Sequence, residues 1–444
     1  MKKILIVSYV FPPAGGITVQ RALSFAKYLP ANGFEVHVLT AGNAAVPVLD
    51  PGLLKHIPPE VRVHRSFTPE LPYYLRKKIW SLLAPRPSSP QAPKESASPA
   101  TPGLRSRIMA GIKQRFSPDP EIVWVPFALR RARKIVRQYG VEYVLVTAPP
   151  FSSFLIGCGL KREFPQIKFI SDFRDEWLRF YLTEFEFLKT PGTRRKAETI
   201  ERETVERSDL VVAVTASSLN EIRSRYPEQP DSKFALVSNG YDPEAFRDFR
   251  PRPHGTGKIV VTHAGTVYKS SSPRYYLDAL DALPEEIRAR FETRFVGRIT
   301  PEEQPFLENR KSEIKLLGNV PQAQALRYME ETDYLLLTMT NDYSLPGKLF
   351  EYLATGKRIL AFSPVGGEVD RILKETGAGW CAECEDKSMA RRMLLKASEP
   401  CMIEPDHKRI GEYSRVDLVT LFSAILQQRL EQPSRAGLAH AGVS

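Results

Sequence analysis

The sequence predicts an α/β protein built from two doubly wound parallel sheets. Short apolar runs alternate with helical patterns through the first half of the chain, and the alternation starts again after residue 257. Strands that are separated by helices pair in parallel and carry helices on both faces of the sheet. The length of 444 residues also exceeds what one hydrophobic core usually supports, so two domains are expected.

The individual elements follow in order from the apolar periodicity. In the first half, strands are expected at residues 3–9, 35–40, 143–147, 168–171, 210–215 and 234–238, and helices at 18–29, 126–139, 151–163, 193–208 and 217–225. In the second half, strands are expected at 258–263, 292–296, 333–339 and 358–362, and helices at 273–282, 323–330, 348–354 and 368–375. The stretch 246–258 between the halves is rich in Pro, Gly and charge, which is typical of a linker.

One segment interrupts the first half. Residues 84–103, APRPSSPQAPKESASPATPG, are too poor in apolar residues to bury a core, and we expect a mobile surface loop within a basic insert at 84–118. Its flanks, YYLRKKIWSLL and LRSRIMAGIKQRF, combine Lys and Arg with aromatic and aliphatic residues. They fit either an interfacial helix on anionic lipid or a solvated charged helix packed on its domain.

The charge balance limits the possible partners. The formal net charge is +12, which indicates an anionic partner such as a phosphorylated small molecule or a membrane surface. No apolar stretch approaches the roughly 18 residues that span a bilayer. The protein is therefore expected in the cytoplasm or at the cytoplasmic face of the inner membrane. Nucleic acid is not expected as a partner, because the basic residues are scattered and no recognition module is visible.

The four cysteines are too few for a disulfide scaffold and favour a reducing compartment. Cys381 and Cys384, with Cys401 and His407 further on, offer the alternative of a zinc site. Their spacing matches no zinc-finger pattern. The surrounding sequence is also typical of a strand, in which a separation of three places side chains on opposite faces. No metal site is therefore predicted.

The first motif is SYVFPPAGGITVQR at residues 8–21, where an apolar run leads into Gly15-Gly16 and then into a helical pattern. A strand, a glycine turn and a helix are typical of a nucleotide-binding unit. The dinucleotide fingerprint G-x-G-x-x-G is absent. We expect Gly15 and Gly16 to let the backbone approach a ligand without a side chain in the way.

The second motif, SLPGKLFEYLATGK at residues 344–357, predicts a short helix that begins near Pro346 and ends before Gly356. Lys348 and Glu351 are three residues apart, so they share a face of this helix. The helix N-terminus carries a partial positive charge and suits a phosphate, and a carboxylate beside it can accept hydrogen bonds from a ribose diol. The alternative is a solvated Lys/Glu pair.

Three further segments end apolar runs with small-residue turns: LVSNGYDPEAF at 236–246, THAGTVYK at 262–269 and LLGNVP at 316–321. Such turns are predicted to meet at one edge of the second sheet, beside the helix N-terminus, and to form a site for an anionic nucleotide. The residues concerned are Asn239, Gly240, Gly265, Thr266, Lys269, Gly318, Asn319 and Val320.

The motif DFRDEW follows a predicted strand of the first sheet. Arg174 is expected to pair with a phosphate while Asp172 and Asp175 orient an acceptor hydroxyl. The alternative is a structural Asp–Arg network that fixes the loop. Of the histidines, His37 is expected to pack inside a strand, whereas His263 precedes a glycine turn and is a candidate for the cleft.

Seven segments together resemble one protein family: PPAGGITVQRALSFAKYLPANGFEVHVLT, PDPEIVWVPFALRRARKIV, TAPPFSSFLIG, ISDFRDEW, VSNGYDPEAF, HAGTVYK and PGKLFEYLATGKRILAF. They are similar to the GT-B glycosyltransferases of the large retaining family four, over nearly the whole length. The resemblance implies two doubly wound Rossmann-like domains that face a central cleft, the acceptor-side domain at 1–248 and the donor domain at 257–410. It also implies a C-terminal helix at 411–432 that crosses back to the first domain. The tail at 433–444 is expected to be disordered.

The resemblance also assigns roles to individual residues. Glu351 would hold the donor ribose hydroxyls, and Lys269 would neutralise the donor diphosphate. The helix N-terminus would assist, through Pro346, Gly347, Lys348 and Leu349. The backbone of 318–320 would meet the base, and the glycines at 15 and 16 would approach the reacting sugar and phosphate. Many family members carry a further glutamate that contacts the donor sugar, and Tyr343 stands at that position here.

The activity implied is transfer of a sugar from a nucleotide-diphosphate donor to a hydroxyl of a lipid-linked or polysaccharide acceptor, as in cell-surface polysaccharide or lipopolysaccharide biosynthesis. Lys269 and Glu351, with Asp172, Arg174 and Asp175, would form the catalytic set. No cofactor and no metal are expected, and no Asp-x-Asp motif is present. Two alternatives are a sugar-nucleotide epimerase on the same fold and a non-catalytic basic module that binds an anionic membrane or a glycan.

Overall fold

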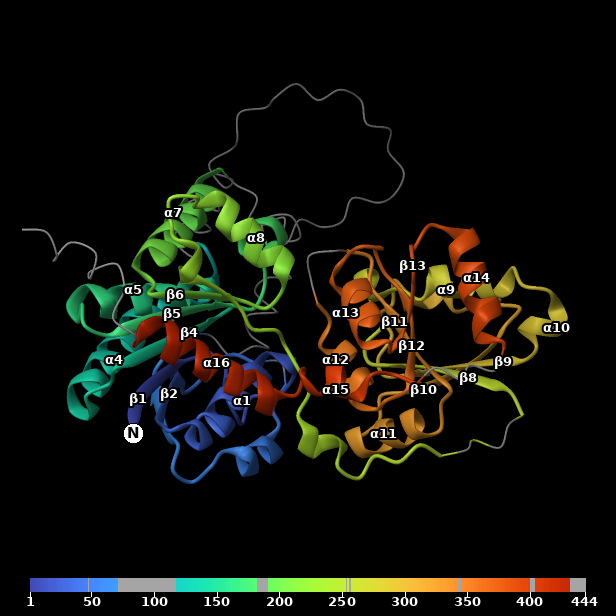
Figure 1. The fold of residues 1–444 in the computed structure, drawn as a ribbon, viewed down its shortest axis with the longest axis horizontal. Helices are drawn as coiled ribbons and strands as arrows, with labels where there is room; N and C mark the ends of the chain where they lie inside the picture. Colours follow the sequence, from blue (N-terminus) through green and yellow to red (C-terminus); the bar gives the residue numbers. More distant parts are fainter. Residues whose placement is uncertain are drawn as a thin grey trace, which may run out of the picture. The chain divides into compact units, whose positions relative to one another are not determined.

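A computed structural model describes residues 1–46, 48–70, 117–181, 191–252, 254, 257–341, 345–399 and 404–431. Most of the insert expected at 84–118, Tyr343, Cys401 and the tail at 433–444 lie outside these residues. The chain divides into two compact units (Figure 1). Unit 1 comprises residues 1–214, 219–236 and 422–444, and unit 2 comprises 215–218 and 237–421.

Unit 1 contains a seven-stranded parallel sheet in the order β3-β2-β1-β4-β5-β6-β7, with helices on both faces (Figure 1). The strands are β1 (Lys2–Val7), β2 (Phe34–Ala41), β3 (Arg62–Ser66), β4 (Tyr143–Ala148), β5 (Lys168–Phe173), β6 (Leu210–Ala213) and β7 (Phe234–Leu236). The main helices are α1 (Gln20–Tyr28), α4 (Val125–Tyr139), α5 (Phe154–Glu163), α7 (Pro191–Arg207) and α8 (Ala216–Arg225). In the register, Ile4 pairs with Val36 on one side and Tyr143 on the other, so the strand order reverses at β1.

Unit 2 contains a six-stranded parallel sheet in the order β10-β9-β8-β11-β12-β13. The strands are β8 (Ile259–Ala264), β9 (Phe291–Val296), β10 (Glu313–Gly318), β11 (Tyr334–Thr338), β12 (Arg358–Phe362) and β13 (Gly379–Ala382). The helices are α9 (Arg274–Asp281), α10 (Glu285–Arg288), α11 (Gln322–Glu330), α12 (Gly347–Ala354), α13 (Glu368–Thr376), α14 (Lys387–Ala397) and α15 (His407–Gly411). The expected fold class, with two doubly wound parallel sheets, is confirmed.

The last helix, α16 (Arg415–Leu430), begins among residues of unit 2 and ends among residues of unit 1. Its second half packs on unit 1, where the ring of Phe422 lies 4.8 Å from the ring of Phe25. Glu431, just beyond the helix, accepts hydrogen bonds from the Tyr143 hydroxyl at 2.7 Å and from Lys2. The expected C-terminal helix that returns to the first domain is therefore present.

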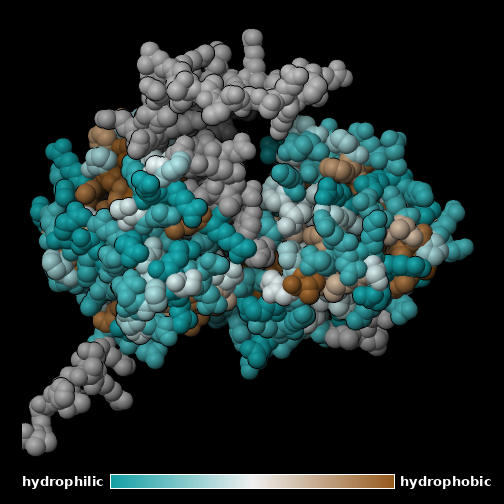
Figure 2. Space-filling model, turned by 90° about the horizontal axis from the view of Figure 1, so that it is seen from above, coloured by the Kyte–Doolittle hydropathy of each residue, from teal (hydrophilic) through white to brown (hydrophobic). Residues whose placement is uncertain are grey.

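Each unit has its own core, built from central strands that are buried on both faces. In β4 every residue is buried, and the same holds for β6, β9 and β11. Continuous apolar strands are typical of parallel sheets covered on both sides. Hydrophilic residues cover most of the surface seen in Figure 2, with small separate hydrophobic patches. None of the described helices is long and apolar enough to cross a bilayer.

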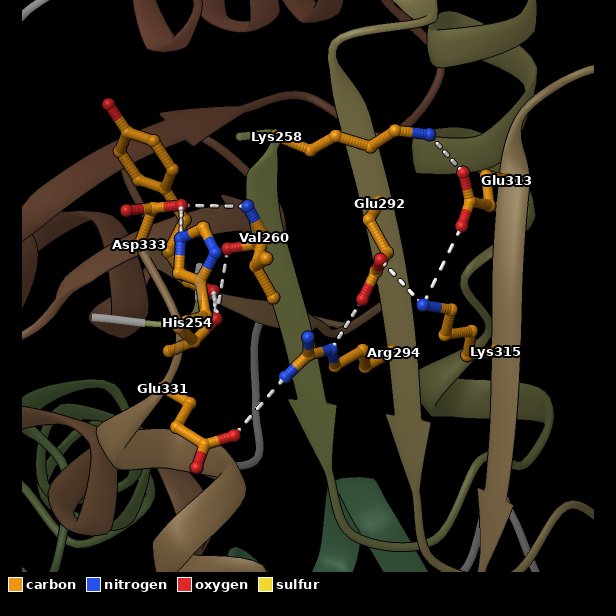
Figure 3. A network of polar contacts seen from close by, with 11 residues as sticks. His254, Lys258, Val260, Glu292, Arg294, Glu313, Lys315, Glu331 and Asp333 are labelled. Atoms are coloured by element: carbon orange, nitrogen blue, oxygen red, sulfur yellow. Dashed lines mark hydrogen bonds and ion pairs between the residues drawn. The ribbon is translucent and has the colours of Figure 1, made fainter. Parts of the chain in front are cut away.

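A network of charges joins β9 to the edge strand β10 of the unit 2 sheet (Figure 3). Glu292 on β9 accepts hydrogen bonds from Arg294 at 2.6 Å and from Lys315 on the neighbouring edge strand β10 at 2.7 Å. Burial opposes its ionisation, but these two cations outweigh burial and lower the pKa of the Glu292 carboxyl. Charged side chains on an edge strand discourage pairing with another chain.

Candidate functional site

The start of α12 in unit 2 carries the densest group of predicted site residues. Pro346 caps this helix and Gly347 is its first residue, and no described side chain bonds to its N-terminal N–H groups. The side chain of Leu349 is fully buried and anchors the first turn in the core. Lys348 is half-buried, with its Nζ 3.1 Å from His263 Nε2 and 3.3 Å from Ser271 Oγ. The helix therefore holds an ammonium group beside its own positively polarised end.

The partner of Lys348 is a neutral imidazole. His263 is fully buried at the end of β8, and its Nδ1 lies 3.1 Å from the carbonyl oxygen of Leu336. Since that carbonyl only accepts, Nδ1 carries the proton and the Nε2 lone pair faces Lys348. Burial, and then the charge of Lys348, hold the pKa of His263 well below its ordinary value. Burial also lowers the pKa of the Lys348 amine to about 8. The ammonium thus has no counter-anion among its hydrogen-bond partners.

Glu351 lies one turn further along α12. Its side chain is exposed to solvent, and it makes no hydrogen bond to a described residue. The surrounding protein raises the pKa of the Glu351 carboxyl, while Arg415 and Lys348 act against that rise. Solvent nevertheless reaches this carboxylate. The carboxylate is free to accept hydrogen bonds from a ligand.

Three glycine turns lie at the carboxyl ends of β8, β9 and β10, and the first of them, at Gly265, lies against Lys348 of this helix. Gly265, Gly297 and Gly318 all have positive φ, at 133°, 134° and 69°. Gly265 N donates to Val296 O at 2.7 Å, and Gly297 N donates to Gly318 O at 2.7 Å. A Cβ on Gly297 would lie 2.2 Å from Gly265 O, and a Cβ on Gly265 would lie 3.2 Å from the Lys348 side chain. Gly265 and Gly297 need glycine because the Lys348 side chain and backbone atoms approach them closely, whereas Gly318 has open space and needs glycine for its positive φ.

Gly297 is a further candidate residue that the sequence analysis did not name. Its signal is FVGRIT, an apolar strand that ends directly in a glycine. Arg298, which follows it, and Lys269, which begins the short helix after the Gly265 turn, are both exposed and pair with no described side chain. Asn319 and Val320 follow the third turn at the same edge. The sequence therefore predicted two of the three glycine turns and one of the two exposed cations.

Asn239 and Gly240 are close to a different feature. A Cβ on Gly240 would lie 2.2 Å from Tyr413 O, and Arg415 Nε donates to Gly240 O at 3.0 Å. Tyr241 N also donates to Tyr413 O at 3.1 Å. Contact with the turn between α15 and α16 therefore accounts for glycine at position 240 without a ligand.

In unit 1, the charged residues of DFRDEW have unequal surroundings. Asp172 is fully buried and accepts hydrogen bonds from Arg21 at 2.7–3.1 Å and from Thr147 Oγ1 at 2.7 Å. Arg174 donates to backbone carbonyl oxygens, to Ala148 at 3.2 Å and to Thr18 and Pro149. These contacts tie β5 to the loops that follow β1 and β4.

Asp175 is the exception in this motif. Its side chain is partly exposed and makes no hydrogen bond or ion pair with a described residue. Burial raises the pKa of the Asp175 carboxyl, and the charge of Arg174 opposes the rise. Of the three charged residues predicted here, Asp175 alone retains hydrogen-bonding capacity for a ligand among the described contacts.

The glycine loop after β1 lies at the same edge of the unit 1 sheet. Gly15 N donates to Val48 O at 2.9 Å, and a Cβ on Gly15 would lie 3.0 Å from Val48 Cγ1. Gly16 has φ 85° and open space around its Cα. The first glycine is therefore required for packing within the unit, and the second for a left-handed conformation that exposes the backbone at the loop tip.

A buried carboxylate that the sequence analysis did not single out lies nearby. Asp119 accepts hydrogen bonds from Ser152 N at 2.9 Å and Ser152 Oγ at 2.5 Å. Burial raises the pKa of Asp119 to about 6. Asp119 lies within PDPEIVW and Ser152 within TAPPFSSF, two of the segments that carry the family resemblance.

A hollow of about 670 Å³ lies at the opposite, amino edge of the unit 1 sheet. Two of the cations that line this hollow already donate hydrogen bonds to backbone carbonyl groups. Lys233 donates to Val205 O, and Arg429 donates to Phe234 O. Because of these contacts, the two cations have few hydrogen bonds left to offer to a ligand. Elsewhere, Cys381 Sγ contacts Ser363 O and Cys384 Sγ contacts Met339 O. No group of three metal-ligating side chains occurs among the described residues.

Comparison with known proteins gives a family match over part of the chain. Residues 81–245 match the profile of Glycosyltransferase Family 4. A curated relative, "Probable glycosyltransferase WbjE" of Pseudomonas aeruginosa, is 27% identical over 153 residues. That alignment covers 33% of this chain and 38% of the relative, so the chain spans well under half of it.

Solved structures match over nearly the full length. Sucrose-phosphate synthase from Thermosynechococcus elongatus is similar with a TM-score of 0.61 and 14% identity, covering 97% of this chain and 99% of that one. Anabaena Alr3699/HepE in complex with UDP and glucose is similar with a TM-score of 0.54 and 13% identity, covering 97% of this chain and 99% of that one. The chain therefore has the GT-B fold, with two Rossmann-like parallel-sheet units, and its residues 81–245 match Glycosyltransferase Family 4.

Proposed function

We propose that this chain is a retaining glycosyltransferase that moves a sugar from a nucleotide-diphosphate donor to a hydroxyl of a lipid-linked or polysaccharide acceptor. One observation carries the proposal: at the start of α12, the hydrogen-bond partners of Lys348 among the described residues are all neutral, and Lys348 lies against the glycine turn after β8. A positive charge whose described hydrogen-bond partners are all neutral, beside a helix N-terminus, is suited to an anion. The Family 4 match and the resemblance to a protein solved with UDP and glucose support the same reading.

The donor would bind along the carboxyl edge of the unit 2 sheet. The diphosphate would contact Lys348 and the N–H groups of Gly347 and Lys348, with Lys269 and Arg298 adding positive potential. Glu351, one turn away and exposed, would accept hydrogen bonds from the ribose hydroxyls. The backbone of 318–320, after β10, would contact the base. This differs from the sequence expectation in giving the principal phosphate contact to Lys348 rather than to Lys269.

The chemistry requires stabilisation of a leaving diphosphate. As the bond between the anomeric carbon and the diphosphate oxygen breaks, negative charge grows on that oxygen while the sugar gains oxocarbenium character. The acceptor oxygen bonds to the anomeric carbon on the same face, and its proton passes to the departing diphosphate. Lys348 and the N-terminus of α12 would stabilise the growing charge, usually the largest single contribution to such catalysis. We propose that no metal and no cofactor take part.

The acceptor would bind at the carboxyl edge of the unit 1 sheet. Asp175 retains a carboxylate there that no described residue occupies, and it would accept a hydrogen bond from the acceptor hydroxyl. Asp172 and Arg174 would act as positioning residues, because they tie β5 to the loops carrying Thr18 and Pro149. We place the reaction at the cytoplasmic face of the inner membrane, in keeping with the basic charge and the free cysteines.

Calorimetric titration of the full chain with UDP, GDP and ADP tests the donor site. Glu351→Ala should weaken binding of the preferred nucleotide by about 1.5–3 kcal/mol, the value of a hydrogen bond to a charged group. Glu399→Ala removes an exposed glutamate of the same unit and should leave the affinity unchanged. Equal affinities in both variants would remove the ribose assignment.

Mass spectrometry of the full chain incubated with a panel of sugar nucleotides and a membrane lipid extract tests the reaction. A lipid that gains the mass of one sugar supports transfer. An isomerised donor with no transfer would instead indicate an epimerase. Absence of nucleotide affinity below millimolar concentration would indicate a non-catalytic binding module.

A further inference from the structure

Helix α4 of unit 1 has an exposed stripe whose chemistry the proposed reaction does not use. The buried side of α4 consists of Ala128, Ala132, Ile135 and Val136. Among the exposed residues of α4, which also include Pro126 and Arg137, five are related by spacings of three and four: Phe127, Arg130, Arg131, Lys134 and Gln138. We call these five residues the α4 stripe. Residues three and four apart are neighbours on a helix, so its three cations form one continuous surface.

The cations of the α4 stripe are not neutralised by described residues. Arg133 and the exposed Arg137 of the same helix form ion pairs with Glu163. Arg130, Arg131 and Lys134 form no ion pair with any residue that the structure describes. Three adjacent charges without counter-ions repel one another and are stabilised by an anionic partner.

One end of the stripe is apolar. Phe127 is 42% exposed, and Phe67, just after the edge strand β3, is 58% exposed. Their rings meet edge to face with centroids 5.4 Å apart. Neither ring has a polar atom to hydrate, so two exposed phenylalanines in contact form a small apolar projection beside the cations.

We propose that the α4 stripe, with Phe67, docks unit 1 on an anionic lipid bilayer. Arg130, Arg131 and Lys134 would bind the headgroup phosphates, while Phe67 and Phe127 enter the interface between headgroups and acyl chains. Surfaces that combine basic residues with exposed aromatic side chains bind anionic membranes in this manner. Charge complementarity selects the occupant, because an apolar protein partner would leave the three cations unpaired.

The position of the α4 stripe determines which edge of unit 1 would face the bilayer, and this bears on the class of acceptor. Phe67 follows the carboxyl end of β3, and Phe127 lies in the first turn of α4, at that same edge of the sheet. Asp175 follows the carboxyl end of the parallel strand β5. Docking would therefore bring the edge that carries Asp175 toward the bilayer. Only this last step rests on the proposed function, and it favours the lipid-linked class of acceptor.

The test is co-sedimentation of the full chain with vesicles of phosphatidylcholine, with or without phosphatidylglycerol. The wild-type chain should bind only the vesicles that contain phosphatidylglycerol, and less at high salt. The triple variant Arg130→Gln/Arg131→Gln/Lys134→Gln should bind about a hundredfold more weakly, roughly fivefold for each cation near the surface. The variant Phe67→Ser/Phe127→Ser should also lose binding.

The matched control removes the same charge from α7, which is separated from α4 by α5 in the same unit. Arg194→Gln/Arg195→Gln/Arg202→Gln should bind vesicles as the wild type does within about twofold, apart from the small effect of net charge. Equal binding by the α4 and α7 variants would overturn the proposal. So would a wild-type chain that binds RNA through the α4 stripe but never sediments with vesicles. UDP titration of the α4 variant reports separately on the donor site, which should be unaffected.

Discussion

At the carboxyl edge of the unit 1 sheet, Asp172 and Arg174 are held by hydrogen bonds within their own unit, whereas at the same edge of the unit 2 sheet the described hydrogen-bond partners of Lys348 are uncharged. Asp172 lies in a closed arrangement with Arg21 and Thr147, and Arg174 holds three carbonyl groups. In unit 2, the hydrogen-bond partners of Lys348 among the described residues are a neutral imidazole and a hydroxyl. Two sheets of the same topology thus use charge in different ways.

The difference separates residues that shape a site from residues that bind a ligand. A buried carboxylate whose oxygens are all occupied, such as Asp172, stabilises loops but has nothing to offer a substrate. Glu176 and Glu201, joined through Arg225, repeat this arrangement one loop further along. Lys348 and Asp175 keep capacity for new hydrogen bonds. Residue type alone does not distinguish the two groups, but their contacts do.

The largest loss of stability is expected when the hydrogen-bonded cluster of Asp172 with Arg21 and Thr147 is broken. Arg21→Ala would leave the fully buried Asp172 without its charge partner and should lower the free energy of unfolding of unit 1 by about 3–5 kcal/mol. Urea unfolding followed by a unit 1 probe such as Trp124 fluorescence measures it. Arg194→Ala, which breaks an exposed ion pair with Glu198, should cost no more than about 0.5 kcal/mol. Similar costs for both variants would mean that the Asp172 cluster does not stabilise the edge.

The sequence predicted most of this framework because central strands are continuous apolar runs. It did not predict β3 or β10, and both are edge strands in which charged residues alternate with apolar ones. In β10 the exposed positions include Glu313 and Lys315, which belong to the charged network at that edge. Solubility at an open edge requires polar residues, and these weaken the pattern by which a buried strand is identified.

The second largest loss of stability is expected from substitutions in the glycine turns. Gly297→Ala places a methyl group at the 2.2 Å contact with Gly265 O, in a backbone with φ 134°. The conformation alone should cost about 1–3 kcal/mol of unit 2 stability, and the clash should add to it. Gly16→Ala in unit 1 has a similar conformational cost but open space, so it should destabilise less. Thermal unfolding of both variants checks the difference, and equal loss would contradict the tight packing of the unit 2 turns.

The comparison also ranks the two lysines of the donor site. Lys348→Ala should weaken nucleotide-diphosphate binding by about 1.5–3 kcal/mol, because it removes a charged hydrogen-bond donor held in place by His263 and Ser271. Lys269→Ala should weaken it less, since the Lys269 side chain is exposed and must be ordered on binding. Calorimetric titration gives both values. A greater loss for Lys269 would restore the assignment made from the sequence.

The chemistry of the candidate site was only half visible in the sequence. The motif PGKLFEYLATGK identified Lys348 and Glu351 because both lie within one short helix. The contact of Lys348 with His263 joins residues 85 positions apart, and that of Arg21 with Asp172 joins residues 151 apart. No local pattern encodes these pairs. They arise because parallel strands bring their carboxyl ends to one edge of the sheet. Whether each charged group has a partner could therefore be determined only from the fold.

The smallest expected effect is a pH dependence that belongs to unit 2 alone. Lys348, with its pKa lowered to about 8, should be charged at pH 7 and neutral at pH 9. Affinity for a nucleotide-diphosphate sugar, whose diphosphate does not titrate in this range, should therefore stay level up to pH 7. It should then fall by about tenfold by pH 9, as the ammonium loses its proton. His263 stays neutral throughout, because its pKa lies well below this range. Lys348→Arg keeps the charge and should remove the fall; a fall that persists in that variant would assign the titration to another group.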